Sequence, residues 1–283
     1  MSRRLIIIII LGITAVIAEV FFYYYNQYFY PIDPQKGFEV QTPNTAQKQK
    51  EIEVFLPTQE TKIIGTKFVI YGKGRAFENT INYRVSDGNS KQLYVGSFMT
   101  SAPDAGIFGY FHQEIDLTKI LSTVPDKIIL AVMEISAKDG EDIHKTTWEL
   151  DLQQNSTSFF SYYLNNNLDP EITCQKTYSV ARTSNKTQTP LKTSIEELLK
   201  GPAHEELEAG FYTSINSGVK LNSAKIENNI AYLDFDSKLD EGVAGSCLVT
   251  SIRQQIETTA KQFPTVKEVV ISINDRVEPI LQP

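Results

Sequence analysis

The sequence predicts a multidomain α+β protein: an N-terminal membrane helix, an all-β sandwich, and a compact α/β domain with two helices on one sheet. Three observations support this prediction. An apolar run of 21 residues lies near the amino terminus, between Leu5 and Tyr25. Short segments of alternating hydrophobicity fill residues 52–152. Near the carboxyl end, residues 233–273 combine a helical period with a strand period on either side.

The composition of the whole chain is that of an ordinary globular protein. Of its 283 residues, 41% are hydrophobic and 22% are charged. A net charge of −7 and an isoelectric point near 5.2 argue against a nucleic-acid partner, which requires a clustered basic face. With two cysteines and three histidines, the chain is not a disulfide-dense scaffold, and a structural zinc site is not expected.

The amino terminus predicts a membrane anchor. Leu5 to Tyr25 would span about 31 Å as a helix, which matches the hydrocarbon thickness of a bilayer. Arg3 and Arg4 place the amino terminus in the cytoplasm. Glu19 lies near the outer interface, where its carboxylate reaches water. We expect residues 1–30 to be a signal-anchor transmembrane segment. The protein is then single-pass in the cell membrane, with its C-terminal bulk extracytoplasmic.

A cleaved signal peptide is the competing interpretation of the same segment. Its apolar core would run from Leu5 to Ile17, with Val16 and Ala18 as the small residues before the cut. Both interpretations export the rest of the chain. Residues 31–51 are rich in Pro, Gln, Lys, Thr and Asn, which is typical of a flexible linker.

Residues 52–152 predict a β-sandwich, because about seven short strands follow one another without an amphipathic helix. Turn chemistry such as Asp87-Gly88-Asn89 separates the strands. No Cys–Trp–Cys pattern is present, so an antibody-type domain is not implied. The predicted strands are Ile52–Leu56, Lys67–Tyr71, Ile81–Val85, Leu93–Phe98, Phe108–Leu117, Lys127–Ser136 and a last one containing Trp148, Leu150 and Leu152.

After a polar joint at residues 153–158, residues 159–283 predict the α/β domain. A capping box of Thr193 with Glu196, or Ser194 with Glu197, is expected to start a helix over Ile195–Lys200. The predicted strands before and after it are Phe159–Leu164, Tyr178–Arg182, and the hairpin of Lys220–Ile226 with Ile230–Phe235.

The strongest periodic pattern is a long helix that begins near Gly245 and Ser246 and stops before Pro264. A strand over Glu268–Ile273 follows, in which apolar residues alternate. Strand, helix and strand together form the predicted core of this domain. The apolar face of the helix has a spacing of three and four: Val249, Ile252, Ile256, Ala260 and Phe263.

Four segments of the sandwich region form a recognisable set: Ile52-Glu53-Val54 followed by Pro57, the stretch from Gly65 to Gly74, Phe108-Gly109-Tyr110-Phe111, and Ala137-Lys138-Asp139-Gly140. In these segments the region resembles the immunoglobulin-like domain of bacterial spore-germination proteins.

Residues 159–283 contain a more specific set of motifs. They are Arg182, Leu198-Leu199-Lys200-Gly201-Pro202, Gly210, Thr213-Ser214-Ile215, Gly218-Val219-Lys220-Leu221, Asp234-Phe235, Leu239, Gly242-Val243-Ala244-Gly245-Ser246, Ile252-Arg253-Gln254-Gln255-Ile256 and Gln262-Phe263-Pro264-Thr265-Val266-Lys267. In these motifs the region resembles the GerMN domain of sporulation and spore-germination proteins. The resemblance implies an exported, non-catalytic envelope module. Such a module is similar to the ring-building domains of sporulation channels and secretion systems, which associate with copies of themselves or with other envelope proteins.

Cys174 and Cys247 are the only cysteines, and both fall in the exported part of the chain. An even number in an oxidising compartment predicts a disulfide between them. Two separate buried thiols are the alternative. A reactive Cys247 or Ser246 at a helix amino terminus is a third possibility, but Gly245-Ser246-Cys247-Leu248 lacks the second glycine of a nucleophile elbow.

No catalytic, cofactor-binding or metal-binding residue is predicted. His112, His144 and His204 are scattered, and His204-Glu205-Glu206 is not the spaced histidine pair that binds zinc. Asp234 and Asp236 could form a carboxylate pair on one face of a strand end, although solvated carboxylates are commoner at such positions.

The sequence thus predicts a membrane-anchored, non-enzymatic envelope protein that presents two modules outside the membrane. Its expected partners are other envelope proteins or further copies of itself, with peptidoglycan as a further candidate. A link to sporulation or germination is also expected. It contacts the membrane through residues 5–25, and no cofactor or nucleic acid is expected. The alternative is a cell-wall-active envelope hydrolase, which requires a pocket with converging catalytic groups.

Overall fold

The computed structural model describes residues 50–282, and the chain from Lys50 onward forms one compact unit. The expected anchor at residues 1–30 lies outside the described residues, as does the linker up to residue 49. Between Lys50 and Gln282, no helix is long and apolar enough to cross a membrane.

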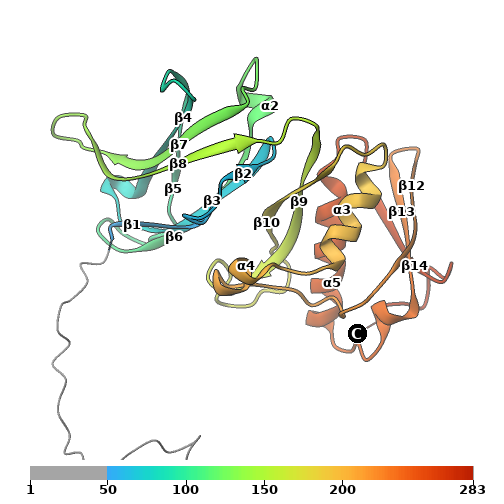
Figure 1. The fold of residues 1–283 in the computed structure, drawn as a ribbon. Helices are drawn as coiled ribbons and strands as arrows, with labels where there is room; N and C mark the ends of the chain where they lie inside the picture. The colour runs from blue at the N-terminus through green and yellow to red at the C-terminus, as the bar shows by residue number, and fades with distance from the viewer. Residues whose placement is uncertain (1–49, 283) are drawn as a thin grey trace, which may run out of the picture. The chain divides into compact units, whose positions relative to one another are not determined.

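The first domain is a sandwich of two β-sheets (Figure 1). One sheet has the order β1-β3-β6, and the other has the order β2-β8-β7-β4-β5. Neighbouring strands are antiparallel except for the parallel pair β2–β8. The elements are β1 (Ile52–Leu56), β2 (Ile63–Ile64), β3 (Lys67–Gly74), η1 (Phe77–Asn79), β4 (Thr80–Asp87), β5 (Gln92–Met99), β6 (Gly109–Asp116), α2 (Leu117–Ile120), β7 (Lys127–Ile135) and β8 (Asp142–Leu152).

Alternation in the sequence explains the sandwich core. Ile81, Tyr83 and Val85 of β4 point inward and are buried, because successive side chains of a strand point to opposite faces. In the turn between β4 and β5, the Asp87 carboxylate accepts backbone hydrogen bonds from Asn89 and Lys91, both 2.9 Å long. The predicted seven strands are all present. The two-residue strand β2 is an addition that was not predicted.

The second domain contains two three-stranded sheets, of orders β10-β9-β11 and β12-β13-β14. The helices α3 and α5 lie between them (Figure 1). The prediction of two helices on one sheet is therefore wrong. The elements are β9 (Ser156–Asn165), β10 (Tyr178–Asn185), α3 (Pro190–Leu199), α4 (His204–Glu208), β11 (Phe211–Tyr212), β12 (Leu221–Glu227), β13 (Ile230–Phe235), η2 (Ser237–Asp240), α5 (Ser246–Lys261) and β14 (Glu268–Ile273).

Side chains of α5 explain why the sheets stay separate. Gln262, just after α5, accepts a hydrogen bond from the backbone N–H of Phe160 (2.8 Å) and donates to its carbonyl (2.7 Å). Thr259 accepts from the N–H of Tyr162 at 3.1 Å. These two residues occupy backbone groups of β9 that a strand of the other sheet would otherwise pair with.

The strand–helix–strand core is confirmed. β12 and β13 form an antiparallel hairpin whose turn residues, Asn228 and Asn229, have φ of 51° and 66°, as a two-residue hairpin turn requires. β13 then pairs in parallel with β14, and α5 forms the crossover between them.

The predicted start of α3 is wrong, whereas the predicted start of α5 is confirmed. α3 begins at Pro190, five residues earlier than predicted, because proline suits the first helical turn. Thr193 and Ser194 therefore lie inside the helix, and their hydroxyls donate back to the carbonyls of Thr189 and Leu191. α5 begins at Ser246 as predicted, but no side chain caps it.

Tyr71 of β3 links the two domains. Its buried hydroxyl donates to the Ala209 carbonyl at 2.9 Å and to Oδ1 of Asn165 at 3.3 Å, and it accepts from Asn167 at 3.1 Å. Its ring packs edge-on against Phe211 at 5.2 Å between centroids. This buried contact joins the sandwich to the second domain.

Candidate interaction surface

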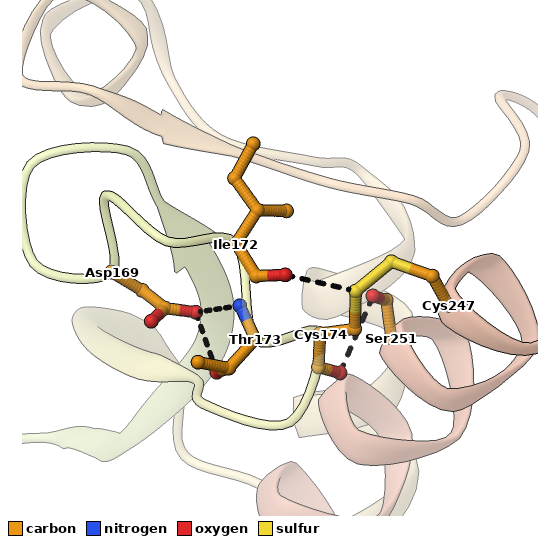
Figure 2. The surroundings of a disulfide bond; sticks show 6 residues. All are labelled: Asp169, Ile172, Thr173, Cys174, Cys247 and Ser251. Carbon is orange, nitrogen blue, oxygen red and sulfur yellow. Dashed lines mark hydrogen bonds between the residues drawn. A yellow bond between two sulfur atoms is a disulfide. The ribbon is translucent and has the colours of Figure 1, made fainter.

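The structure joins Cys174 and Cys247 in a disulfide, with their Cα atoms 5.3 Å apart (Figure 2). Cys247 lies in the first turn of α5, and Cys174 lies in the loop between β9 and β10. Further hydrogen bonds hold this loop. The Asp169 carboxylate accepts from the backbone and hydroxyl of Thr173 at 2.8 and 2.7 Å, and Ser251 donates to the Cys174 carbonyl at 3.4 Å. Neither cysteine is free here to act as a nucleophile.

Asp234 and Asp236 do not form a catalytic pair. The buried Asp234 carboxylate accepts from Ser272 at 2.7 Å, from the backbone N–H of Asp275 at 2.8 Å, and from Asn222 at 2.9 Å. Burial raises the pKa of Asp234, but these hydrogen bonds outweigh it and hold the pKa below its ordinary value. Asp236 instead accepts from the backbone N–H of Lys220 at 3.2 Å. Both carboxylates join local backbone segments.

The three histidines lie in three separate places. Nε2 of the half-buried His112 is 2.8 Å from the Ser179 carbonyl at the junction of the domains. His144 pairs with Glu134 in the sandwich at 3.0 Å, and His204 is exposed on α4. Within residues 50–282, no group of three or more His, Cys, Asp or Glu side chains could hold a metal ion.

An ion pair between the half-buried Arg182 and the buried Glu206 was not predicted from the sequence. The guanidinium of Arg182, on β10, donates to both carboxylate oxygens of Glu206 on α4, at 2.5 and 2.7 Å. The same carboxylate accepts from the backbone N–H of Ala203 at 2.8 Å. Burial lowers the pKa of Arg182, but the hydrogen bonds that Arg182 donates to Glu206 raise this pKa above the ordinary value. The pair fixes α4 against the sheet, which is a structural role.

The free edge of β12 is the best candidate for an interaction surface. β12 is the terminal strand of its sheet and pairs only with β13. Glu227 and Ile230 close the two-residue hairpin, so Glu227 and Lys225 direct their backbone groups toward β13. By alternation, the N–H and C=O groups of Ala224 and Ile226 face outward. An extended segment of another chain could pair with these groups.

A groove runs beside this edge, between β12 and α3. At one end lies a cavity of about 220 Å³, and at the other a more open one of about 370 Å³. The first is lined in part by Pro190, Ala224, Ile226 and Phe263, so its wall is largely apolar. Ile226 keeps 40% of its surface exposed, although its side chain is large and apolar.

Lysines also line the groove. Lys192 and Lys225 lie at the first cavity, and Lys200 and Lys220 lie at the second together with Glu196. Neighbouring glutamates pair with three of these lysines. The first cavity is therefore mainly apolar, whereas the second is as polar as it is apolar, and side chains of both charges border the groove. The sequence predicted the hairpin, but it did not place α3 beside β12.

Two family models match the chain. Residues 161–278 match "Sporulation and spore germination", and residues 51–141 match "Immunoglobulin-like domain of bacterial spore germination". Together they span both folded domains. No curated protein matches the chain.

Three solved structures are each similar to less than half of the chain. The first GerMN domain of the sporulation protein GerM from Bacillus subtilis is 23% identical, with 42% of this chain and 84% of that chain covered and a TM-score of 0.33. The tandem GerMN domains of the same protein are 26% identical, with 44% and 41% covered and a TM-score of 0.35. A putative lipoprotein from Clostridium perfringens is 14% identical, with 43% and 75% covered and a TM-score of 0.28. The chain spans less than half the length of the tandem GerM structure.

Proposed function

Because the chain combines an immunoglobulin-like domain of bacterial spore germination with a GerMN domain of the sporulation and spore-germination family, we propose that it is a non-enzymatic protein of the cell envelope. Residues 5–25 anchor it in the membrane, and both domains are presented outside the membrane for assembly with other envelope proteins or with itself. The free edge of β12 beside the α3 groove is the observation that carries the assembly role.

The proposed contact is strand addition. An extended partner segment pairs with the outward backbone groups of Ala224 and Ile226 and thereby lengthens the sheet. Alternate side chains of that segment then point into the groove and contact Pro190 and Phe263. Backbone pairing supplies affinity, whereas the groove selects the side chains.

The alternative, a cell-wall-active hydrolase, has less support. Such an enzyme needs a carboxylate free to exchange a proton with its substrate. Among the described residues, the carboxylates of Asp234 and Glu206 are buried and serve as structural acceptors. The families matched by the two domains are also defined by sporulation and germination, not by a hydrolytic activity.

A proline on the β12 edge tests the assembly role. Ala224→Pro removes an outward N–H without removing a hydrogen bond to β13, since proline is tolerated on an edge strand when its position faces solvent. Ser223→Ala is the matched control, because it changes a neighbouring exposed side chain that lines neither cavity and keeps the backbone donor. We expect the full-length wild type and the control to capture the same envelope proteins, and the proline variant to lose them. Equal capture by all three, with similar thermal unfolding, would contradict strand addition.

Two further measurements address the remaining parts of the proposal. Sedimentation with purified peptidoglycan measures binding to the cell wall. If the Ala224→Pro variant still sediments with peptidoglycan, the wall does not bind at the strand edge that is proposed for a protein partner. For export, a reporter fused to the carboxyl end should be active only outside the cytoplasm. A reporter active only inside the cell would contradict the proposed location.

A further inference from the structure

One end of the sandwich exposes large apolar side chains. Phe77 is 59% exposed, Met99 is 68% exposed, Ile107 is 48% exposed and Ile135 is 38% exposed. We call these four residues the apolar tip. Single exposed apolar residues are normal on protein surfaces, but a cluster marks an interaction site.

Backbone contacts bring the strands of the tip together. Met99 lies opposite Thr80 where β5 meets β4, and the backbone N–H of Thr100 donates to the Asn79 carbonyl at 2.9 Å. Phe77, in the adjoining η1 turn, donates its backbone N–H to Glu134 at 2.9 Å. Glu134 precedes Ile135, so Phe77, Met99 and Ile135 share this end of the sheet.

The loop that carries Ile107 joins the same end. The N–H of Ser101 donates to the Tyr110 carbonyl at 2.7 Å, which closes this loop next to the end of β5. The side chain of Asn79 donates to the Ala102 carbonyl at 3.4 Å. The loop therefore packs on the η1 turn and presents Ile107 beside it.

The described chain also begins at this end. The backbone N–H of Arg75 donates to the Glu51 carbonyl at 2.8 Å, and the Arg75 guanidinium pairs with the Glu51 carboxylate at 2.7 Å. Arg75 lies two residues before Phe77. The covalent connection to residues 1–49 therefore leaves the domain next to the apolar tip.

Chain length limits how far the tip can lie from a membrane anchor. Between Tyr25 and Lys50 there are 24 residues, because positions 26 to 49 separate them. A random coil of that length would have an average end-to-end distance of about 25 Å. A surface tethered so closely meets its target at a high effective concentration, so a few apolar side chains are enough for binding.

We propose that the apolar tip inserts into the interfacial region of the lipid bilayer to which the chain is tethered. The proposal rests on the anchoring at residues 5–25 that is part of the proposed function. Phe77, Met99 and Ile107 are the side chains that enter the headgroup boundary, where aromatic and aliphatic groups leave water.

The charges around the tip define which lipids it prefers. The exposed acidic side chains at this end, Glu78, Asp104, Asp139 and Glu141, outnumber the exposed Lys50 and Lys138, and Arg75 is paired with Glu51. Anionic lipids attract basic segments and repel acidic ones. Insertion is therefore driven by apolar contact, and it weakens as the fraction of anionic lipid increases.

Site-specific fluorescence on the full-length chain tests the proposal. Since both native cysteines are in a disulfide, an environment-sensitive dye labels only the cysteine introduced by Ile107→Cys. The matched control is Asn89→Cys, in the turn at the other end of β4. Because β4 has eight residues, its two ends lie about 26 Å apart. Each protein is reconstituted into phosphatidylcholine vesicles that contain nitroxide-labelled lipid, and flotation reports anchoring separately.

We expect quenching at position 107 to be several-fold stronger than at position 89. The additional double substitution Phe77→Ser and Met99→Ser should remove most of that difference while flotation is retained. Replacing half of the phosphatidylcholine by phosphatidylglycerol should reduce the quenching at position 107.

Three results would overturn the proposal. If the protein floats with the vesicles but quenching is equal or absent at positions 107 and 89, the tip does not contact the bilayer, although the anchor does. Energy transfer between dyes at position 107 on different molecules, without quenching by the labelled lipid, would show that the tip binds a second copy of the chain instead of the bilayer. A chain that does not float contradicts the anchor, and the tip contact fails with it.

Discussion

Removing the disulfide between Cys174 and Cys247 gives the most direct test of how the second domain is stabilised. The bond joins residues separated by 73 positions. In the chain-entropy model, a cross-link of that span removes about 15 cal/mol/K of entropy from the unfolded chain, or about 4 kcal/mol at 25 °C. We therefore expect the double substitution Cys174→Ser and Cys247→Ser to lower the free energy of unfolding by about 2–4 kcal/mol, because measured values often fall below the model.

The native loop should keep its conformation in this variant. Asp169 still accepts both hydrogen bonds from Thr173, and Ser251 still donates to the carbonyl of residue 174. The loss of stability then arises mainly in the unfolded chain, which becomes more expanded. Its larger exposed surface should increase the dependence of the unfolding free energy on denaturant concentration.

Denaturant unfolding can follow the two domains separately. The single tryptophan, Trp148, lies in the sandwich and reports that domain by fluorescence. Helical circular dichroism reports mainly the second domain, which contains α3, α4 and α5. We expect the dichroism transition to move to lower denaturant. A change of less than about 1 kcal/mol in the second domain, with the wild-type bond verified by mass spectrometry under non-reducing conditions, would refute the reasoning.

Three further predictions concern buried polar groups. Arg182→Met should destabilise the protein by about 3–5 kcal/mol, because Glu206 is left buried without its partner; adding Glu206→Leu should recover much of the loss, and no recovery in chemical denaturation would contradict this. Tyr71→Phe should cost about 0.5–1.5 kcal/mol, because the Ala209 carbonyl loses the Tyr71 hydroxyl but keeps the side-chain donors of Asn165 and Asn167. An unchanged unfolding midpoint would show that this hydrogen bond does not stabilise the contact between the domains. Burial lowers the pKa of His112 below its ordinary value of 6.5, against the opposing hydrogen bond to a backbone carbonyl. The unfolded state therefore binds more protons below pH 6.5, so stability should fall as the pH decreases through that value and level off below the folded-state pKa. His112→Gln should remove this dependence in unfolding measured across pH, and an unaltered slope would assign it to other groups.

The amino-acid pattern was sufficient for features that depend on neighbours along the chain. Alternation in β4 predicted which of its side chains are buried, and Asp87-Gly88-Asn89 predicted the turn that follows. The spacing in α5 predicted its buried apolar residues, from Val249 to Ala260. Periodicity succeeds here because each strand or helix must turn its apolar face to the core.

The groove could not be predicted, because it depends on elements far apart in the sequence. α3 begins at Pro190 and β12 at Leu221, and no local pattern specifies that they lie side by side. The contact of Arg182 with Glu206 across 24 residues was missed for the same reason.

The arrangement of the second domain depends on a polar stripe of α5 whose partners the periodicity did not reveal. Ser251, Gln255 and Thr259 recur every four residues and are buried. Thr259 and the following Gln262 bond the backbone of β9, so β9 belongs to a separate sheet. Apolar spacing along a chain specifies which face is buried. The pairing of backbone groups across that face depends on donors and acceptors that only folding brings together. For this reason the domain has two sheets, although the pattern predicted one.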